Sequence, residues 1–350
     1  MTYFLKSGSS FKVSTKDSLD LHEKLPAGNY IIKADPFGNL YLEQIESFVK
    51  PSKLYGDTFK NTDRIIRTFT ERTVSTGIML NGEKGSGKTL LAKNIAIELA
   101  AQGVPTIVIN SPWHGDNFNK LLQDIEQPCM VLFDEFEKVY DRDEQESILT
   151  LLDGVFGSKK LYALTCNDKW RVDQHMRNRP GRIYYMIDFK GLGAEFITEY
   201  CNDNLNAKHH IEKICSIASL FAEFNFDMLK ALVEEMNRYN ESPQESLRML
   251  NAKPEFDNGT KYDVKVVFNG IDVEGVNPSV FDGNPLQQKG ISVGFDPEPE
   301  NDDGEWKSQT FSTEALVSIS AVDGKFVFED NGTRLTLTRI KQHTFNYDAF

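Results

Sequence analysis

Eight consecutive residues, Gly82 to Thr89, have the types and spacing of a phosphate-binding loop. They read Gly-Glu-Lys-Gly-Ser-Gly-Lys-Thr, and the glycines allow backbone N–H groups to turn inward around phosphates. A short apolar run, Gly77–Asn81, precedes the loop, and an amphipathic run, Thr89–Leu99, follows it. This motif requires a strand before the loop and a helix after it. The flanks therefore favour a nucleotide site over a glycine-rich turn that binds nothing.

The end of the loop carries the two side chains that contact the ligand most directly. Lys88 is expected to reach the β- and γ-phosphates, and the Thr89 hydroxyl is expected to bind Mg²⁺. The nucleotide-binding residues predicted from the sequence are Gly82, Glu83, Lys84, Gly85, Ser86, Gly87, Lys88, Thr89 and Leu90.

Two carboxylates follow the apolar run Met130–Phe133. Asp134 can hold Mg²⁺ through its waters, and Glu135 can orient or polarise the attacking water, which is the division of labour that phosphoryl transfer to water needs. Alone, the pair would fit a strand that simply enters solvent. Its position 45 residues after Thr89 predicts a hydrolytic site, with Thr89 and Asp134 as the metal-binding residues and Glu135 as a catalytic residue.

Two more polar segments come later in the chain. Asn167 ends the run Leu161–Cys166, where it could contact the γ-phosphate or the water. Arg177, Arg179 and Arg182 share one turn around a Pro-Gly pair, and alone they would indicate a solvated basic loop. After the other motifs they suggest arginine fingers, whose charge stabilises the loose transition state of phosphoryl transfer. A finger often reaches the site from a neighbouring subunit, so an oligomer is predicted.

The elements that must position these groups divide the chain into four zones. Residues 1–56 are predicted to be β-rich, with a hairpin formed by Asn29–Asp35 and Asn39–Ile45. Strands alternate with helices from 57 to 190, which predicts an α/β domain with a parallel sheet. Residues 191–252 lack strand signals and are expected to form a helical subdomain. The strands expected in the α/β domain are Gly77–Asn81, Val104–Asn110, Cys129–Asp134, Leu161–Thr165 and Ile183–Phe189.

The last zone, residues 253–350, returns to a β pattern. Tyr262–Phe268 and Lys325–Glu329 alternate in polarity, and Asp330–Thr333 has the composition of a hairpin turn. The acidic, proline-containing stretch from Asp296 to Glu305 is expected to be a solvated loop. An acidic β-rich C-terminal domain is therefore predicted.

The order of these motifs resembles the AAA+ ATPases over about residues 57–250. The segment Arg179-Pro-Gly-Arg182 is similar to the second region of homology of the AAA family proper. The resemblance implies ATP and Mg²⁺ as cofactors, Asn167 as the sensor-1 residue, Arg179 and Arg182 as paired fingers acting in trans, and assembly into a homo-oligomer, typically a hexameric ring. Ile109–Pro112 and Leu151–Val155 look most like the branch that includes the mitochondrial respiratory-complex assembly ATPase, and small bacteriophage AAA ATPases also look similar.

Two departures from the wider AAA+ pattern bear on function. The segment that would carry a sensor-2 arginine, Phe224–Leu229, has none, which agrees with the AAA family proper and argues against the clamp-loader and helicase-loader branches. Members that thread proteins carry an aromatic–hydrophobic–glycine motif in their pore. The nearest match here is Trp113-His-Gly115, where Trp113 could either grip a polypeptide or pack locally.

Composition narrows the range of partners. The chain has 350 residues and a net charge of −13. From Glu255 onward it contains 17 acidic and 8 basic residues. An acidic surface repels phosphate backbones, so binding to nucleic acid is disfavoured. No apolar run reaches about 18 residues and no signal peptide is evident, so we expect a cytoplasmic protein without a membrane partner.

The leading hypothesis is an ATP-hydrolysing, ring-forming AAA+ protein that remodels or assembles protein complexes, with an unidentified protein as its client. The alternative is an ATPase that acts on nucleic acid as a loader, translocase or repair factor. A third hypothesis is a scaffold that binds ATP but hardly hydrolyses it. Glu135 and the arginines disfavour that scaffold.

Overall fold

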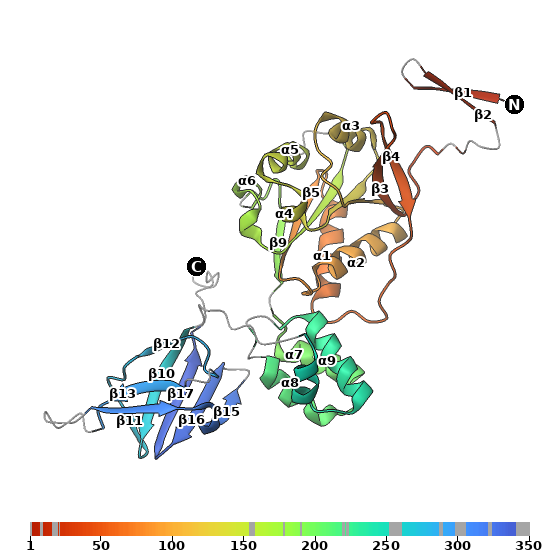
Figure 1. Ribbon diagram of the computed structural model, residues 1–350. Helices are drawn as coiled ribbons and strands as arrows, with labels where there is room; N and C mark the ends of the chain where they lie inside the picture. The colour runs from red at the N-terminus through yellow and green to blue at the C-terminus, as the bar shows by residue number, and fades with distance from the viewer. Residues whose placement is uncertain are drawn as a thin grey trace. The chain divides into compact units, whose positions relative to one another are not determined.

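A computed structural model describes residues 2–7, 10–15, 20, 22–153, 158–177, 179–189, 191–218, 221, 224–251, 261–286, 290–297, 306–320 and 324–340. The chain divides into two compact units, residues 1–189 and 190–350 (Figure 1). The first unit contains every motif to which the sequence assigns chemistry.

A seven-stranded sheet forms the centre of the first unit, in the order β4-β3-β6-β7-β8-β5-β9. Neighbouring strands run parallel, except that β3 and β4 are antiparallel. The strands are β3 (Asn29–Ala34), β4 (Leu40–Ile45), β5 (Thr76–Gly82), β6 (Thr106–Ile109), β7 (Cys129–Phe133), β8 (Lys160–Cys166) and β9 (Tyr185–Phe189). The prediction of an α/β fold with a mostly parallel sheet is confirmed.

Apolar side chains cover both faces of this sheet, because successive residues of a strand point to opposite sides. In β5, Met79 belongs to one core, whereas Ile78 and Leu80 belong to the other. Helices α1 (Thr58–Glu71) and α2 (Lys88–Ala101) supply buried residues to the core that contains Ile78. The core on the Met79 side receives residues from α3 (Asp116–Asp124), α4 (Phe136–Val139), α5 (Arg142–Leu152) and α6 (Gln174–Arg177).

The topology brings the ends of three strands to one edge of the sheet. β7, β8 and β5 are adjacent and parallel, so their carboxyl ends lie on the same side. The phosphate-binding loop leaves β5 there, Asp134 follows β7, and Asn167 follows β8. Residues that are up to 85 positions apart in sequence therefore meet at this edge, which is where open α/β sheets bind ligands.

The hairpin predicted at residues 29–45 forms, but it belongs to this same sheet rather than to a separate β-rich region. Asn29, Tyr30 and Ile31 of β3 pair in parallel with residues 106–108 of β6. A local pattern of alternation does not show which distant strand a hairpin will join. Upstream of it, β1 (Thr2–Ser7) pairs with β2 (Ser10–Thr15). The numerical domain boundaries proposed from the sequence stay predictions.

The second unit begins with helices and continues with strands. Its helices are α7 (Ala194–Asn204), α8 (Ile211–Ala218), α9 (Phe226–Tyr239) and α10 (Pro243–Met249). α9 buries Leu229, Leu232, Val233 and Met236, which recur at helical spacing. Asn225 begins this helix, because its side chain accepts a hydrogen bond from the Met228 N–H at 2.9 Å.

Two antiparallel sheets share one hydrophobic core in residues 261–340. The larger sheet has the order β11-β10-β17-β16-β15, with β12 also paired to β10, and the smaller sheet pairs β13 with β14. Their bounds are β10 (Lys261–Phe268), β11 (Ile271–Val273), β12 (Val280–Asp282), β13 (Ile291–Phe295), β14 (Lys307–Phe311), β15 (Leu316–Ser320), β16 (Lys325–Asp330) and β17 (Thr333–Arg339). Residues 298–305 of the expected acidic loop lie outside the described residues.

Candidate functional site

The phosphate-binding loop joins β5 to α2 and depends on glycine at both ends. Gly87, with a φ of +99°, is in the left-handed region immediately before α2 begins at Lys88. Gly82 has a φ of +149°, and a Cβ atom there would lie 2.3 Å from the Phe189 carbonyl oxygen. No larger side chain fits at Gly82 without moving the backbone of β9. The loop's course is thus fixed against the sheet, with the N-terminus of α2 facing the ligand side.

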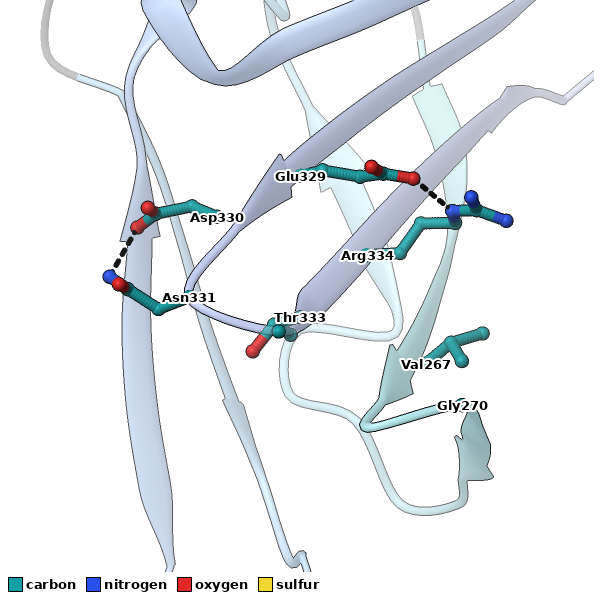
Figure 2. A pocket seen from close by; sticks show the side chains of 8 residues that line it. Val267, Gly270, Glu329, Asp330, Asn331, Thr333 and Arg334 are labelled. Carbon is teal, nitrogen blue, oxygen red and sulfur yellow. Dashed lines mark hydrogen bonds and ion pairs between the residues drawn. The ribbon is translucent and has the colours of Figure 1, made fainter.

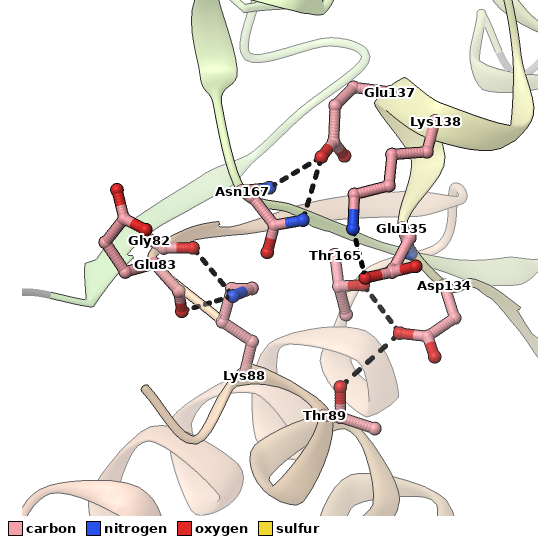
Figure 3. Close-up of polar contacts among 10 residues, drawn as sticks. All are labelled: Gly82, Glu83, Lys88, Thr89, Asp134, Glu135, Glu137, Lys138, Thr165 and Asn167. Carbon is pink, nitrogen blue, oxygen red and sulfur yellow. Dashed lines mark hydrogen bonds and ion pairs between the residues drawn. The ribbon is translucent and has the colours of Figure 1, made fainter. Parts of the chain in front are cut away.

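The Lys88 side chain is buried and folds back onto the loop. Its ammonium group donates to the carbonyl oxygens of Gly82 and Glu83 at 2.6 and 2.8 Å (Figure 3). Burial lowers the pKa of Lys88, and nearby acidic groups, among them Glu137 and Asp134, partly oppose this shift. Anionic phosphate oxygens could replace the two carbonyl acceptors, and they would favour the charged ammonium more strongly.

The predicted metal-binding residues lie beside each other. The Thr89 hydroxyl is 3.4 Å from Asp134 Oδ1, and the Thr165 hydroxyl donates to the same carboxylate oxygen at 2.7 Å (Figure 3). Thr165 also accepts the Glu135 N–H at 2.8 Å. A hydroxyl next to a carboxylate, beside the phosphate-binding loop, is the oxygen donor set that suits nucleotide-bound Mg²⁺. These residues therefore fit the metal, and Thr165, which the sequence analysis did not single out, holds both acidic residues in place.

Glu135 lies at the turn between β7 and α4 in a left-handed conformation, with φ of 50° and ψ of 46°. Its carboxylate forms an ion pair with Lys138 Nζ at 2.6 Å, and its side chain is 44% exposed. The hydrogen bond from Lys138 is the main reason that the pKa of Glu135 is lowered, with further contributions from Asn167 and Lys84. Glu135 is therefore ionised at neutral pH, as a group that polarises water must be.

Asn167 is positioned by a glutamate that the sequence analysis missed. Glu137 Oε1 accepts both the backbone N–H and the side-chain amide of Asn167, each at 3.0 Å (Figure 3). Glu137 is only 4% exposed, and its Oε2 has no hydrogen-bond partner among the described residues. Burying a carboxylate costs free energy unless hydrogen bonds or an opposite charge compensate for its lost hydration. The signal in the sequence was a second acid two residues after Glu135, at the start of α4.

The two arginines predicted to act as a pair are in different environments. Arg179 is exposed, whereas Arg182 is 9% exposed and pairs through two nitrogens with the Asp153 carboxylate. Arg182 also donates to the His175 carbonyl oxygen at 3.0 Å. The charge of Arg182 is thus paired within the chain in this structure, and the role of both arginines as fingers acting in trans stays a prediction. Of these two arginines, Arg179 is the one without an ion-pair partner among the described residues.

Trp113 packs against the hydrophobic core rather than projecting from it. Its indole nitrogen is buried without a hydrogen-bond partner among the described residues, and its carbonyl oxygen accepts the Tyr140 hydroxyl at 2.8 Å. Of the two roles left open by the sequence, the structure agrees with local packing.

A concavity of about 440 Å³ lies at the turns of the C-terminal β region (Figure 2). Two of its charged side chains, Arg334 and Glu329, form an ion pair at 2.5 Å. The Asn331 amide likewise donates to Asp330 at 3.0 Å. Among the described residues, no cluster of three or more His, Cys, Asp or Glu side chains could hold a metal ion. The groups suited to chemistry are therefore those at the edge of the parallel sheet.

Comparison with known proteins agrees with this geometry. Residues 78–190 match the model of the ATPase family associated with various cellular activities (AAA). That match begins in β5 and covers the phosphate-binding loop, both carboxylates, Asn167 and the arginine turn. The chain therefore carries an AAA+ ATPase domain.

Individual relatives are similar at low identity. The peroxisomal ATPase PEX1 of Cricetulus griseus is 27% identical over 205 residues, which is 49% of this chain and 16% of that protein. A putative cell division cycle ATPase of Plasmodium falciparum is 26% identical over 200 residues, 51% of this chain and 16% of that protein. Protein mac-1 of Caenorhabditis elegans is 31% identical over 138 residues, 33% of this chain and 17% of that protein. The aligned part of the chain spans less than a fifth of each relative's length.

No helix in the described parts of the chain has both the length and the apolar character needed to cross a membrane.

Proposed function

We propose that this chain hydrolyses ATP within a ring of identical subunits and uses the energy to remodel or assemble protein complexes. The observation that carries the proposal is the convergence of Lys88, Thr89, Asp134, Glu135 and Asn167 at one edge of the sheet, with Arg179 exposed. The first five are groups that one chain supplies for binding and attack. The sixth is a cation without an ion-pair partner among the described residues.

Each group has a distinct task in the proposed reaction. Lys88 holds the β- and γ-phosphate oxygens, and Asn167, held by Glu137, contacts the γ-phosphate or the water. Glu135 orients the water and draws on its proton as the oxygen attacks the γ-phosphorus, while the bond to the leaving ADP oxygen breaks. Thr89 and Asp134 would hold Mg²⁺, which neutralises charge on the phosphates when bound.

The need for a ring rests on Arg179. Charge spreads over the γ-phosphate oxygens in the transition state, and an arginine can stabilise it through a planar, permanently charged fork. We infer that Arg179 acts in the site of the adjacent subunit. Because the arginine would then come from a different subunit than the bound ATP, turnover would depend on assembly.

A protein client is favoured by charge. The region from Glu255 onward is strongly acidic, so it disfavours a phosphate backbone as partner. Two of the relatives named above, the peroxisomal ATPase PEX1 and the putative cell division cycle ATPase, are ATPases by name, which supports the activity and leaves the client open.

The test is phosphate release measured on the full chain with Mg²⁺ and ATP, with candidate client proteins, single-stranded DNA and duplex DNA added in turn. We expect basal turnover that rises with protein concentration, stimulation by a protein client and no stimulation by DNA. Stimulation by DNA alone, lost at higher salt, would replace the proposal with an ATPase that acts on nucleic acid. Absence of turnover at any concentration, with ATP bound, would leave the nucleotide-gated scaffold.

A further inference from the structure

Asn81 is a polar residue near the end of a buried strand, and it has no task in the proposed reaction. It immediately precedes Gly82, at which β5 ends and the phosphate-binding loop begins. The five residues of β5 before it are buried, whereas Asn81 is half-buried. Because β5 lies between β8 and β9, the backbone of Asn81 has a partner on each side, Cys166 in β8 and Asp188 in β9. One side chain at this position can therefore reach the ends of both neighbouring strands.

The side-chain amide of Asn81 makes contacts on both sides. Its Nδ2 donates to Asp188 Oδ1 at 2.7 Å, and its Oδ1 accepts the backbone N–H of Lys169 at 2.9 Å. The Cys166 Sγ also lies 3.5 Å from Asn81 Oδ1. Asp188 in turn pairs with the Lys169 ammonium at 2.9 Å. The end of β9 and the turn after β8 are thus joined to each other and to β5.

These contacts hold the turn that carries Asn167. Cys166 and Lys169, which both contact Asn81 Oδ1, lie on either side of Asn167 in the sequence. The backbone of Asn81 continues directly into Gly82, the first residue of the phosphate-binding loop (Figure 3). One side chain therefore ties the turn around Asn167 to the strand from which the loop starts.

Only a side chain with both a donor and an acceptor can make the two shorter contacts. The Asp188 carboxylate needs a donor, and the Lys169 N–H needs an acceptor, so an amide suits both. Alanine would leave the Lys169 N–H without this acceptor. A carboxylate at position 81 would instead face the carboxylate of Asp188, and like charges repel.

We propose that Asn81 is a positioning residue for ATP hydrolysis, which sets the distance from Asn167 to the bound γ-phosphate by joining the turn after β8 to the start of the phosphate-binding loop. The inference rests on the proposed function, because Asn81 acts through the contact that Asn167 makes there. Glu137 holds Asn167 from α4, and Asn81 holds the same turn from β5. Such support matters because a shift of about 1 Å in a group that acts on the substrate can lower turnover about 100-fold.

Asn81→Ala on the full chain tests this role, with kcat measured by phosphate release at saturating ATP and Mg²⁺ and ATP affinity by isothermal titration. We expect kcat to fall about 10-fold while ATP affinity stays within about 2-fold of wild type, because the backbone pairing of β5 still holds the loop. The protein concentration is one at which sedimentation velocity shows equal association of variant and wild type. Asn29→Ala is the matched control: Asn29 is a buried amide in β3 of the same sheet, and it donates to the Glu46 carbonyl oxygen at 3.3 Å. Its removal should lower the melting temperature without changing kcat.

An exchange of the two side chains separates positioning from stability. Asn81→Asp alone places two carboxylates beside each other and should lower kcat at least as much as Asn81→Ala does. Adding Asp188→Asn to that variant restores one donor and one acceptor and leaves one carboxylate for Lys169. We therefore expect the doubly substituted chain to regain kcat to within about 3-fold of wild type.

The outcomes separate this inference from the function on which it rests. If Asn81→Ala hydrolyses ATP at the wild-type rate, or if ATP affinity falls as much as kcat, the positioning role is overturned while the proposed function stands. Failure of the exchange to restore turnover overturns it in the same way. Asn167→Ala should lower kcat by itself and add little to Asn81→Ala, because both changes act on one contact. Normal hydrolysis by Asn167→Ala would instead remove the task given to Asn167 in the proposed function, and the inference with it.

Discussion

The edge of the parallel sheet and the arginine-rich segment after it differ in how their polar groups are satisfied. At the edge, Lys88, Asp134, Glu135 and Asn167 all have hydrogen-bond partners within the same chain. In residues 169–177 and 179, by contrast, Trp170 is exposed, and Arg171, Arg177 and Arg179 have no ion-pair partner among the described residues. The comparison teaches that one chain is sufficient to preorganise the binding and attack of ATP. In the proposed function, the reaction is completed only when Arg179 of this segment reaches the site of an adjacent subunit.

The largest effect should be on ATP affinity and should come from Lys88, at the edge of the parallel sheet. Lys88→Ala removes the charge that faces the β- and γ-phosphates, so ATP affinity should fall by about 100-fold or more. Isothermal titration measures it, with thermal melting to show that the fold survives. Lys93→Ala, an exposed lysine on the same helix, is the control and should bind ATP normally. Undiminished binding by the Lys88 variant would refute the site.

The next largest effects concern Arg179 and Arg182, which belong to one turn but should differ in what their removal changes. Arg179→Ala should lower kcat by about 10³-fold or more without changing thermal stability, because its charge is used only in the transition state. Arg182→Ala should instead lower the free energy of unfolding by about 1–3 kcal/mol, because it leaves Asp153 without its partner.

Both arginine effects have clear checks. Asp153→Ala combined with Arg182→Ala should cost less than the sum of the two single changes, as a double-mutant cycle by denaturant unfolding would show. Mixing the Lys88→Ala and Arg179→Ala proteins should restore some turnover, since some interfaces then join an intact loop to an intact arginine. Normal turnover by Arg179→Ala alone would rule out its role as a finger.

Glu135→Gln keeps the shape of the side chain but removes the charge that polarises water. We expect kcat to fall by about 10²–10⁴-fold while ATP affinity is retained. Phosphate release and isothermal titration together distinguish the two quantities. Turnover close to wild type would show that another residue prepares the water.

Glu137→Ala tests whether the buried glutamate acts only through Asn167. Removing the shared acceptor should leave ATP affinity nearly unchanged and lower kcat about 10-fold, which corresponds to about 1.4 kcal/mol. Asn167→Ala should then add little to the Glu137 variant, because both act on one contact. Independent, multiplying effects would mean that Glu137 has a role of its own.

The smallest effect concerns pH. Lys138 lowers the pKa of Glu135 below its ordinary value of 4.5, so Lys138→Met should raise it. Because turnover is lost as Glu135 becomes protonated, the acid limb of the kcat profile should move to higher pH in this variant. Rates are compared at pH values where circular dichroism shows both proteins folded. An unmoved acid limb would mean that the ion pair does not control the charge of Glu135.

The sequence was sufficient where function depends on neighbours in the chain. The phosphate-binding loop, its strand and its helix could be predicted because eight adjacent residues carry the whole motif. Strand ends such as Asp134 and Asn167 could be placed at one edge because parallel strands share it. The roles assigned to these residues stay predictions that the experiments above address.

Residues whose roles depend on distant partners could not be read in this way. Thr165 lies 30 residues from Glu135 in sequence, yet its hydroxyl joins the two carboxylates. Arg182 has the same residue type and motif as Arg179, and only the position of Asp153, 29 residues earlier, distinguishes them. Likewise, the sequence of residues 29–45 indicated a hairpin but not its pairing with β6.

By itself, the sequence determined that this chain has a phosphate-binding loop, paired carboxylates and an arginine turn on an α/β framework, because local spacing and hydrophobic periodicity encode those features. The tertiary structure decided which of these groups are satisfied inside the chain and which remain for a partner. It paired Arg182 with Asp153, placed Glu137 beside Asn167, packed Trp113 against the core and left Trp170 exposed. Burial and pairing are properties of the packed chain, so identical residue types acquire different roles only after folding.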